Sequence, residues 1–420
     1  MAPPTAEEIT KLNRVSDALV RLITDLVTHL EGLDFSSSTE TDPAHSQLAS
    51  VSLSYDSASL IKAHSTKLSL LIINAPFTPS AIIKVLQELL EAAIPSLASA
   101  ASACEPTRYT KAFSTELRFR CRRVLRYLRD LVFLIPRDGK VLEGNKKDGG
   151  GGKGGCKGSI VATSVVWEAC DDVMKLRTLG VRGLLAEKVN QQRAILEDIR
   201  EELKEWKEEN GDVGSDDEEG DGTDFDDGFG VNGNDPQAQL DELMSAQRIP
   251  KDRTDIRNQL GPCISRLGLL SLLYKAIAKR RIKELPNLPP PVPSSPPAAE
   301  SSSTSTTSPT PASTTIKEQP PKPSSEEKDR EFHLLTVVSR VNEVYPVLKT
   351  LPDEFGELVA AFYKLDAPLV ETTRAQCFRQ ACEAGELLRK PWAKGEERDG
   401  FSDWLDRFRE QMDWPLDPES

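Results

Sequence analysis

The sequence lacks the clustered cysteines and histidines that build metal sites. Its seven cysteines are scattered singly with no CxxC pair, and its four histidines lie far apart. None of them pairs at ligand spacing, and Cys377 and Cys382, five residues apart, would not fall on one line of a helix. We therefore expect no zinc site and no cofactor, and the unpaired cysteines indicate a reduced compartment.

The sequence also lacks an apolar leader and a long apolar run. Its N-terminal segment MAPPTAEEITKLNR is of mixed polarity. The apolar run LSLLIINAPF at 68–77 is too short to cross a bilayer, which needs about 20 apolar residues. These absences predict no membrane span, and we expect a protein of the cytoplasm and nucleus.

Positive charge is in the minority, with 53 basic against 66 acidic residues and a net charge of −13. Such a chain repels nucleic acids and anionic membranes unless it carries a local basic patch. One candidate patch is the arginine face formed by Arg118, Arg122, Arg126 and Arg129. It could grip phosphates, or it could be an ordinary exposed face or pair with the acidic helix at 197–209. We favour the ordinary alternatives and expect no direct nucleic-acid binding.

Enzyme signatures are missing as well. The glycine- and lysine-rich loop at 144–158 has the composition of a phosphate-binding loop, but Lys153 and Lys157 are each followed by glycine, and no strand precedes them. A P-loop needs GxxxxGK[ST] after a strand, so that backbone N–H groups and the lysine surround the phosphates. No pair of carboxylates is placed for acid–base chemistry either. We assign no catalytic residue and expect a non-enzymatic protein.

The sequence does contain helical periodicity throughout. Thr5 and Glu8 form a capping box, and apolar residues recur at steps of three and four along several segments. No segment alternates as a half-buried strand does. The pattern predicts an all-α protein of two helical bundles, because amphipathic helices bury their apolar stripes against one another.

Composition predicts the boundaries of these parts. Stretches rich in glycine and acid, or in proline, serine and threonine, cannot support a core. We expect an N-terminal bundle at 1–209 containing the loop at 144–158, an acidic flexible linker at 210–235, a C-terminal helical domain at 236–412 interrupted by a disordered insert at 286–325, and a tail at 413–420.

The stretch SVVWEACDDVMKL at 164–176 concentrates chemically interesting side chains on one predicted helix. Cys170 could be a nucleophile or a ligand, but its acidic neighbours would raise its pKa and oppose the thiolate form. A small buried thiol is the better interpretation. We predict that Trp167 and Cys170 both belong to the core.

Three segments resemble the cyclin-D-interacting, GCIP-like family: SAIIKVLQELLEAAIPSL at 80–97, VVWEACDDVMKL at 165–176 and GPCISRLGLLSLLYKAIAKR at 261–280. The most specific part is the WEACD motif, which consists of Trp167, Glu168, Ala169, Cys170 and Asp171. The resemblance implies an all-helical, two-domain, non-enzymatic interaction protein of nucleus and cytoplasm, associated with cyclin-like or helix-loop-helix-type regulators.

The two low-complexity inserts suggest a fungal-type relative of that family, for which a D-type cyclin need not be the partner. Long amphipathic helices with few motifs also suit a second class of protein. The alternative is a cytoskeletal or adhesion-type adaptor.

Two short motifs predict regulation. Ser215 in GSDDEEG precedes acids at the positions that a casein-kinase-two type of kinase reads. The alternative is an acidic spacer that no kinase modifies. Lys283, Pro286 and Pro289 fit the basic-x-x-Pro-x-x-Pro pattern that SH3 domains bind as a polyproline helix. The basic run at 279–283 could instead complement a helix C-terminus or act as a nuclear-import signal.

Overall fold

A computed structural model describes residues 4–33, 50–142, 155–210, 249–250, 252–288, 325–393 and 395–412. All regular secondary structure within these ranges is helical, which confirms the all-α prediction. The predicted tail, nearly all of the acidic linker, and most of the loop at 144–158 and of the insert at 286–325 lie outside the described residues.

The chain divides into two compact units. Unit 1 comprises Met1–Leu184 with Pro286–Ser339, and unit 2 comprises Leu185–Leu285 with Arg340–Ser420. The division therefore falls inside the long helix α8 (Gly155–Glu209), before the boundary at 209 that composition suggested. Gly180 interrupts this helix with φ 60° and ψ −173°, a conformation open essentially to glycine alone.

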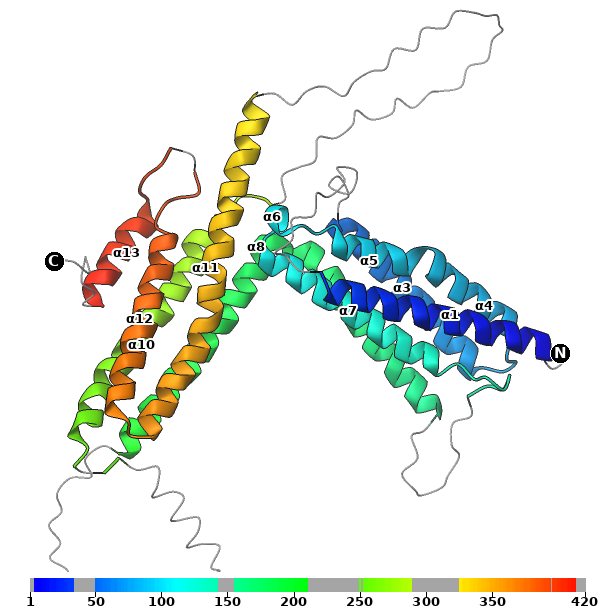
Figure 1. Cartoon of the computed structure of the whole chain (residues 1–420), viewed down its shortest axis with the longest axis horizontal. Coiled ribbons are helices and arrows are strands. Elements are labelled where there is room, and N and C mark those ends of the chain that lie inside the picture. The colour runs from blue at the N-terminus through cyan, green and yellow to red at the C-terminus, as the bar shows by residue number, and fades with distance from the viewer. Residues whose placement is uncertain are drawn as a thin grey trace, which may run out of the picture. The chain divides into compact units, whose positions relative to one another are not determined.

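Unit 1 is a bundle of helices (Figure 1). Its buried side chains are mainly aliphatic. Its elements before α8 are α1 (Ala6–Glu31), α3 (Ser50–Ile73), α4 (Pro79–Glu88), the π-helix η1 (Leu89–Ala93), α5 (Ile94–Ser102), α6 (Pro106–Tyr109) and α7 (Lys111–Phe133). The capping box of Thr5 and Glu8 opens α1 as predicted. The apolar residues that recur along α7 and just beyond its end are all buried: Leu117, Cys121, Val124, Leu128, Leu131 and Ile135.

Unit 2 combines the second part of α8 with the C-terminal helices. These are α10 (Thr254–Ile277), η2 (Ala278–Ile282), α11 (Ser325–Tyr363, which enters this unit at Arg340), α12 (Ala367–Leu387) and α13 (Gly400–Gln411). Helix α11 continues through Pro346 and Pro352. Trp206 of α8 packs edge-on against Phe362 and Tyr363 of α11.

Helix α10 is the central helix of unit 2. Among the described residues, one stretch, Thr254–Ile282, has the length and mean hydropathy that a membrane span requires, and half of its apolar window is buried. Leu260, Leu267 and Tyr274 are completely buried in the protein, and the Tyr274 hydroxyl donates to the Leu348 carbonyl at 2.8 Å. These contacts are those of a core helix.

Candidate functional site

The WEACD motif lies where α8 packs against α3. Asp171 pairs with Lys62 of α3 at 2.6 Å, and the indole Nε1 of Trp167 donates to Thr66 Oγ1 at 3.0 Å. Farther along, the hydroxyls of Ser69 and Ser159 share a buried hydrogen bond of 3.0 Å. Residue numbers fall along α3 as they rise along α8, so the two helices run antiparallel. The polar side chains of the motif thus join one helix to another.

The thiol of Cys170 is fully buried, as predicted. Burial raises its pKa to about 12, and the neighbouring carboxylate of Asp171 adds to this rise. A thiol with such a pKa is protonated at physiological pH and is a poor nucleophile. Ala169 is also buried, whereas Glu168 is exposed. The motif supplies packing atoms on one side and surface charges on the other.

The prediction that Trp167 is a core residue is wrong. Its side chain is 37% exposed, at the edge of the contact between α3 and α8. Val166, Ala169, Cys170 and Val173 form the buried stripe of this helix and leave the indole to one side. An indole has an apolar body and a polar N–H. It can therefore cover the edge of the contact between α3 and α8 while its N–H donates a hydrogen bond to Thr66.

We expect Trp167→Ala to lower the free energy of unfolding by only about 1 to 2 kcal/mol, because it removes one hydrogen bond and a partly exposed ring. A fully buried aromatic costs about 3 to 5 kcal/mol. Urea unfolding followed by circular dichroism measures the difference, and Trp167→Phe isolates the hydrogen bond. A loss above 3 kcal/mol for Trp167→Ala would contradict this placement.

The arginine face of α7 is used inside unit 1. Arg118, predicted to be exposed, is buried, and it donates to the carbonyls of Leu33 and Ala101. It lies on a second buried line of α7 that the sequence pattern did not separate from the exposed face. Arg122 and Arg126 both pair with Glu31 at the end of α1.

Arg281 is the most extensively bonded charged side chain of unit 2. It is 1% exposed, and all five of its N–H groups are used. Nε donates to the Leu388 carbonyl at 2.6 Å, and the two terminal nitrogens grip Asp399 in bidentate fashion. The remaining protons go to the carbonyls of Arg280 and Arg389, and the guanidinium lies 4.3 Å from the Phe401 ring centroid.

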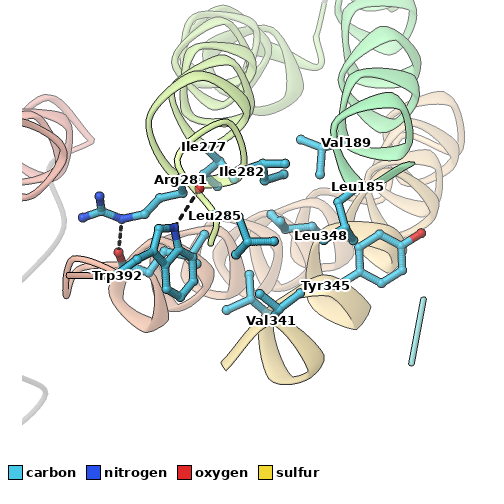
Figure 2. Close-up of a pocket in the computed structure, with 12 residues that line it drawn as sticks. Leu185, Val189, Ile277, Arg281, Ile282, Leu285, Val341, Tyr345, Leu348 and Trp392 are labelled. Carbon is cyan, nitrogen blue, oxygen red and sulfur yellow. Dashed lines mark hydrogen bonds between the residues drawn. The ribbon is translucent and has the colours of Figure 1, made fainter. Parts of the chain in front are cut away.

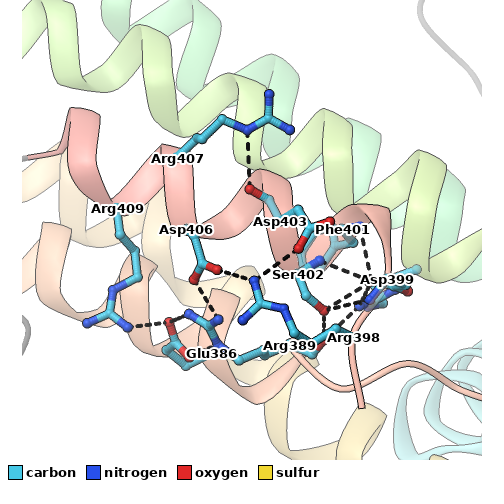
Figure 3. A network of polar contacts seen from close by, with 11 residues as sticks. Glu386, Arg389, Arg398, Asp399, Phe401, Ser402, Asp403, Asp406, Arg407 and Arg409 are labelled. Carbon is cyan, nitrogen blue, oxygen red and sulfur yellow. Dashed lines mark hydrogen bonds and ion pairs between the residues drawn. The ribbon is translucent and has the colours of Figure 1, made fainter. Parts of the chain in front are cut away.

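Asp399 links this arginine to the start of α13. Its Oδ1 accepts from the backbone N–H groups of Phe401 and Ser402, both at 3.0 Å, and so caps the helix (Figure 3). The same oxygen accepts from Arg281 at 2.9 Å. A second set of ion pairs continues along α12 and α13, through Glu386, Arg389, Asp406, Arg398, Asp403 and Arg409. These ion pairs connect α12 to α13 and the segment between them, and most of the charged side chains in the set are paired with one another.

The sequence interpretation missed Arg281 because it treated the basic run at 279–283 as one surface feature. A signal was present: Arg281 follows Tyr274 by seven residues and Ile277 by four, so it continues the buried stripe of α10. A cation in an apolar register needs internal partners. Of the basic residues at 279–283, only those other than Arg281 remain candidates for a nuclear-import signal.

The carboxylate of Asp399 should make stability depend on pH. Burial alone would raise the pKa of Asp399, but the hydrogen bonds from Arg281 and from the N-terminus of α13 outweigh it and hold the pKa well below its usual range. A depressed carboxylate pKa stabilises the fold above the unfolded value of about 4, and this contribution is lost as pH falls toward the folded value.

We therefore expect Asp399→Asn to be less stable than the parent at pH 7, and the difference to shrink steadily below pH 4. Urea titrations at several pH values measure it. Asp403→Asn serves as the control, since Asp403 lies on the same helix with an exposed side chain. A difference that stayed constant down to pH 2 would show that the Asp399 carboxylate does not carry the effect.

A small cavity lies beside Arg281 in unit 2 (Figure 2). Its volume is about 30 Å³, and apart from Arg281 its walls are mainly aliphatic and aromatic, including Leu185, Ile277, Leu348 and Trp392. Sites for small molecules usually measure about 300 to 1,000 Å³, so this space is a packing gap. Among the described residues, no group of three His, Cys, Asp or Glu side chains could hold a metal ion.

The predicted regulatory residues are only partly within the described chain. Lys283 is exposed just after η2, Pro286 is half-buried, and Pro289 lies outside the described residues. Ser215 lies outside them too. The SH3 site and the phosphorylation site therefore stay predictions.

The described geometry defines a class: an all-helical protein whose notable polar residues connect helices. Residues 55–209 match the family model described as "Grap2 and cyclin-D-interacting, N-terminal", which confirms the resemblance seen in the sequence. The chain is also 27% identical over 242 residues to an uncharacterized protein of Schizosaccharomyces pombe. That similarity covers 56% of this chain and 63% of the fission-yeast protein.

Proposed function

We propose that this protein is a non-enzymatic regulator that binds protein partners through helix faces, in cell-cycle or transcription control. The observation that carries the proposal is a set of exposed apolar side chains within the family-matching region. We call these four residues the seam patch: Leu70, Ile160, Val161 and Trp167, which are 52%, 58%, 60% and 37% exposed.

The antiparallel pairing of α3 and α8 supports the contiguity of this patch. Leu70 is one turn beyond Thr66, the residue that bonds Trp167, and Ile160 is two turns before Trp167 on the same line of α8. Leu70 and Ile160 also adjoin the two serines that share a hydrogen bond. Contiguous exposed apolar surface marks protein-interaction sites more often than chance exposure does.

The partners we propose are cyclin-like or helix-loop-helix-type regulators, as the family relationship implies. An amphipathic helix on such a regulator could lay its apolar side against the seam patch. Neighbouring charges such as Lys62 and Asp171 would form the polar rim that such interfaces usually have. We propose that the protein works in the cytoplasm and the nucleus.

Affinity capture from cells of the source organism, followed by mass spectrometry, tests the proposal. We expect cell-cycle or transcription regulators to be recovered, and to be lost with the double variant Ile160→Asp/Val161→Asp. Ile195→Asp is the matched control, because Ile195 is an exposed apolar residue of the same helix outside the patch. Recovery of actin-associated proteins, or equal recovery by both variants, would contradict the proposal.

A further inference from the structure

A second exposed apolar feature lies in unit 2, between α10 and α13. Its walls, here called the α10–α13 groove, consist of Leu269, Leu272, Trp404, Arg407, Phe408 and Gln411. Leu272 is 49% exposed although it lies on the central helix of the unit. Trp404 stacks on Phe408 with ring centroids 5.4 Å apart, which fixes the aromatic wall.

The size of the groove limits what can fill it. Its volume is about 170 Å³. An apolar cavity of about 150 Å³ accommodates a benzene ring, whereas drug-sized ligands use about 300 Å³ or more. The groove therefore fits one large side chain that anchors a longer segment.

The charges around the groove favour an acidic segment. Arg407 is exposed, and its Nε donates to the backbone carbonyl of Asp403. Lys275 of α10 and Lys279 of η2 are exposed, about one and two turns beyond Leu272. Of the neighbouring acids on α13, Asp403 is paired with Arg398, and Glu410 is exposed. Cations thus outnumber unpaired acids at this rim.

We propose that the segment 413–420 of this same chain, DWPLDPES, occupies the α10–α13 groove with Trp414 as its anchor. This segment lies outside the described residues and follows α13, whose Gln411 already lines the groove. Three residues of extended chain reach about 10 Å, which is enough to return Trp414 to the groove.

The sequence of the segment matches the groove in two further respects. Pro415 disfavours a helical conformation at Trp414, so the chain has to leave the axis of α13 at that point. Asp413, Asp417 and Glu419 bring three carboxylates to the cationic rim. An aromatic anchor with flanking acids is the complement of an apolar hollow with flanking cations.

Hydroxyl-radical footprinting of the full chain, read by mass spectrometry, tests the proposal directly. We expect Trp414 to be oxidised about threefold or more slowly than in a free peptide of residues 411–420, because tethering gives the segment a high effective concentration at the groove. Leu272→Glu should abolish this protection. Leu369→Glu should leave it unchanged, because Leu369 is a comparably exposed leucine of the same unit on α12.

Charge reversal provides an independent arm. Arg407→Glu should weaken the protection of Trp414, and adding Asp417→Lys should restore part of it. Oxidation of Trp414 at the free-peptide rate would overturn the proposal, as would protection that survives Leu272→Glu. Protection that rises with protein concentration would also overturn it, since the occupant would then be the segment of a second copy.

Discussion

Arg281→Met is expected to lower the free energy of unfolding by about 3 to 5 kcal/mol, the usual cost of removing one partner from a buried ion pair. The substitution leaves the Asp399 carboxylate without its cation and takes one donor from each of three backbone carbonyls, of which that of Arg389 still accepts from the Ser402 hydroxyl. It also removes the cation from the Phe401 ring. Because Asp399 caps α13, we expect that helix to loosen first.

Denaturant unfolding followed by circular dichroism measures this loss, and hydrogen exchange locates it. Arg280→Met is the matched control, since Arg280 is exposed and donates a hydrogen bond to the Gly400 carbonyl. We expect the control to lose less than about 1 kcal/mol. Equal losses for the two variants would show that the buried cluster is not what stabilises this part of unit 2.

The second large effect is chemical. At pH 8 we expect Cys104, Cys170 and Cys263 to react with a thiolate-selective reagent about a thousandfold more slowly than an exposed cysteine. All three are buried, and burial raises the pKa of each thiol to about 12. Only a minute fraction of each is therefore thiolate, and access is blocked as well.

Labelling should be mapped by mass spectrometry in a Cys156→Ser background, because the side chain of Cys156 lies outside the described residues. Adding denaturant should bring all three cysteines to the rate of a model thiol. Rapid labelling of Cys170 in the folded protein would reopen the interpretation of the WEACD motif as a chemical site.

The buried contacts around Cys170 and those around Arg281 each lie next to an exposed surface. Cys170 and its helix neighbours hold α8 against α3, and they leave the seam patch exposed at the edge of that contact. Arg281 holds the start of α13, which forms one wall of the α10–α13 groove. In both units, rigid internal contacts support a surface on which another segment could bind.

The sequence by itself determined the helical class and the burial of Cys170. Periodicity is enough for these features, because a helix with one apolar side has to bury it. The family resemblance could also be found without coordinates, since it rests on three short segments, each continuous in the sequence. For Cys170, the adjacent acids predicted a buried, unreactive thiol, and the structure shows a fully buried side chain.

Only the tertiary structure decided the roles of Trp167, Arg118 and Arg281. Periodicity says which side of a helix is apolar, but it does not say how many neighbours cover that helix or where their edges fall. Trp167 lies at such an edge. Arg118 and Arg281 are instead buried under neighbouring segments, and their guanidinium groups donate hydrogen bonds to backbone carbonyls of those segments. Those carbonyls come from distant parts of the chain, and local sequence cannot show that folding brings them together.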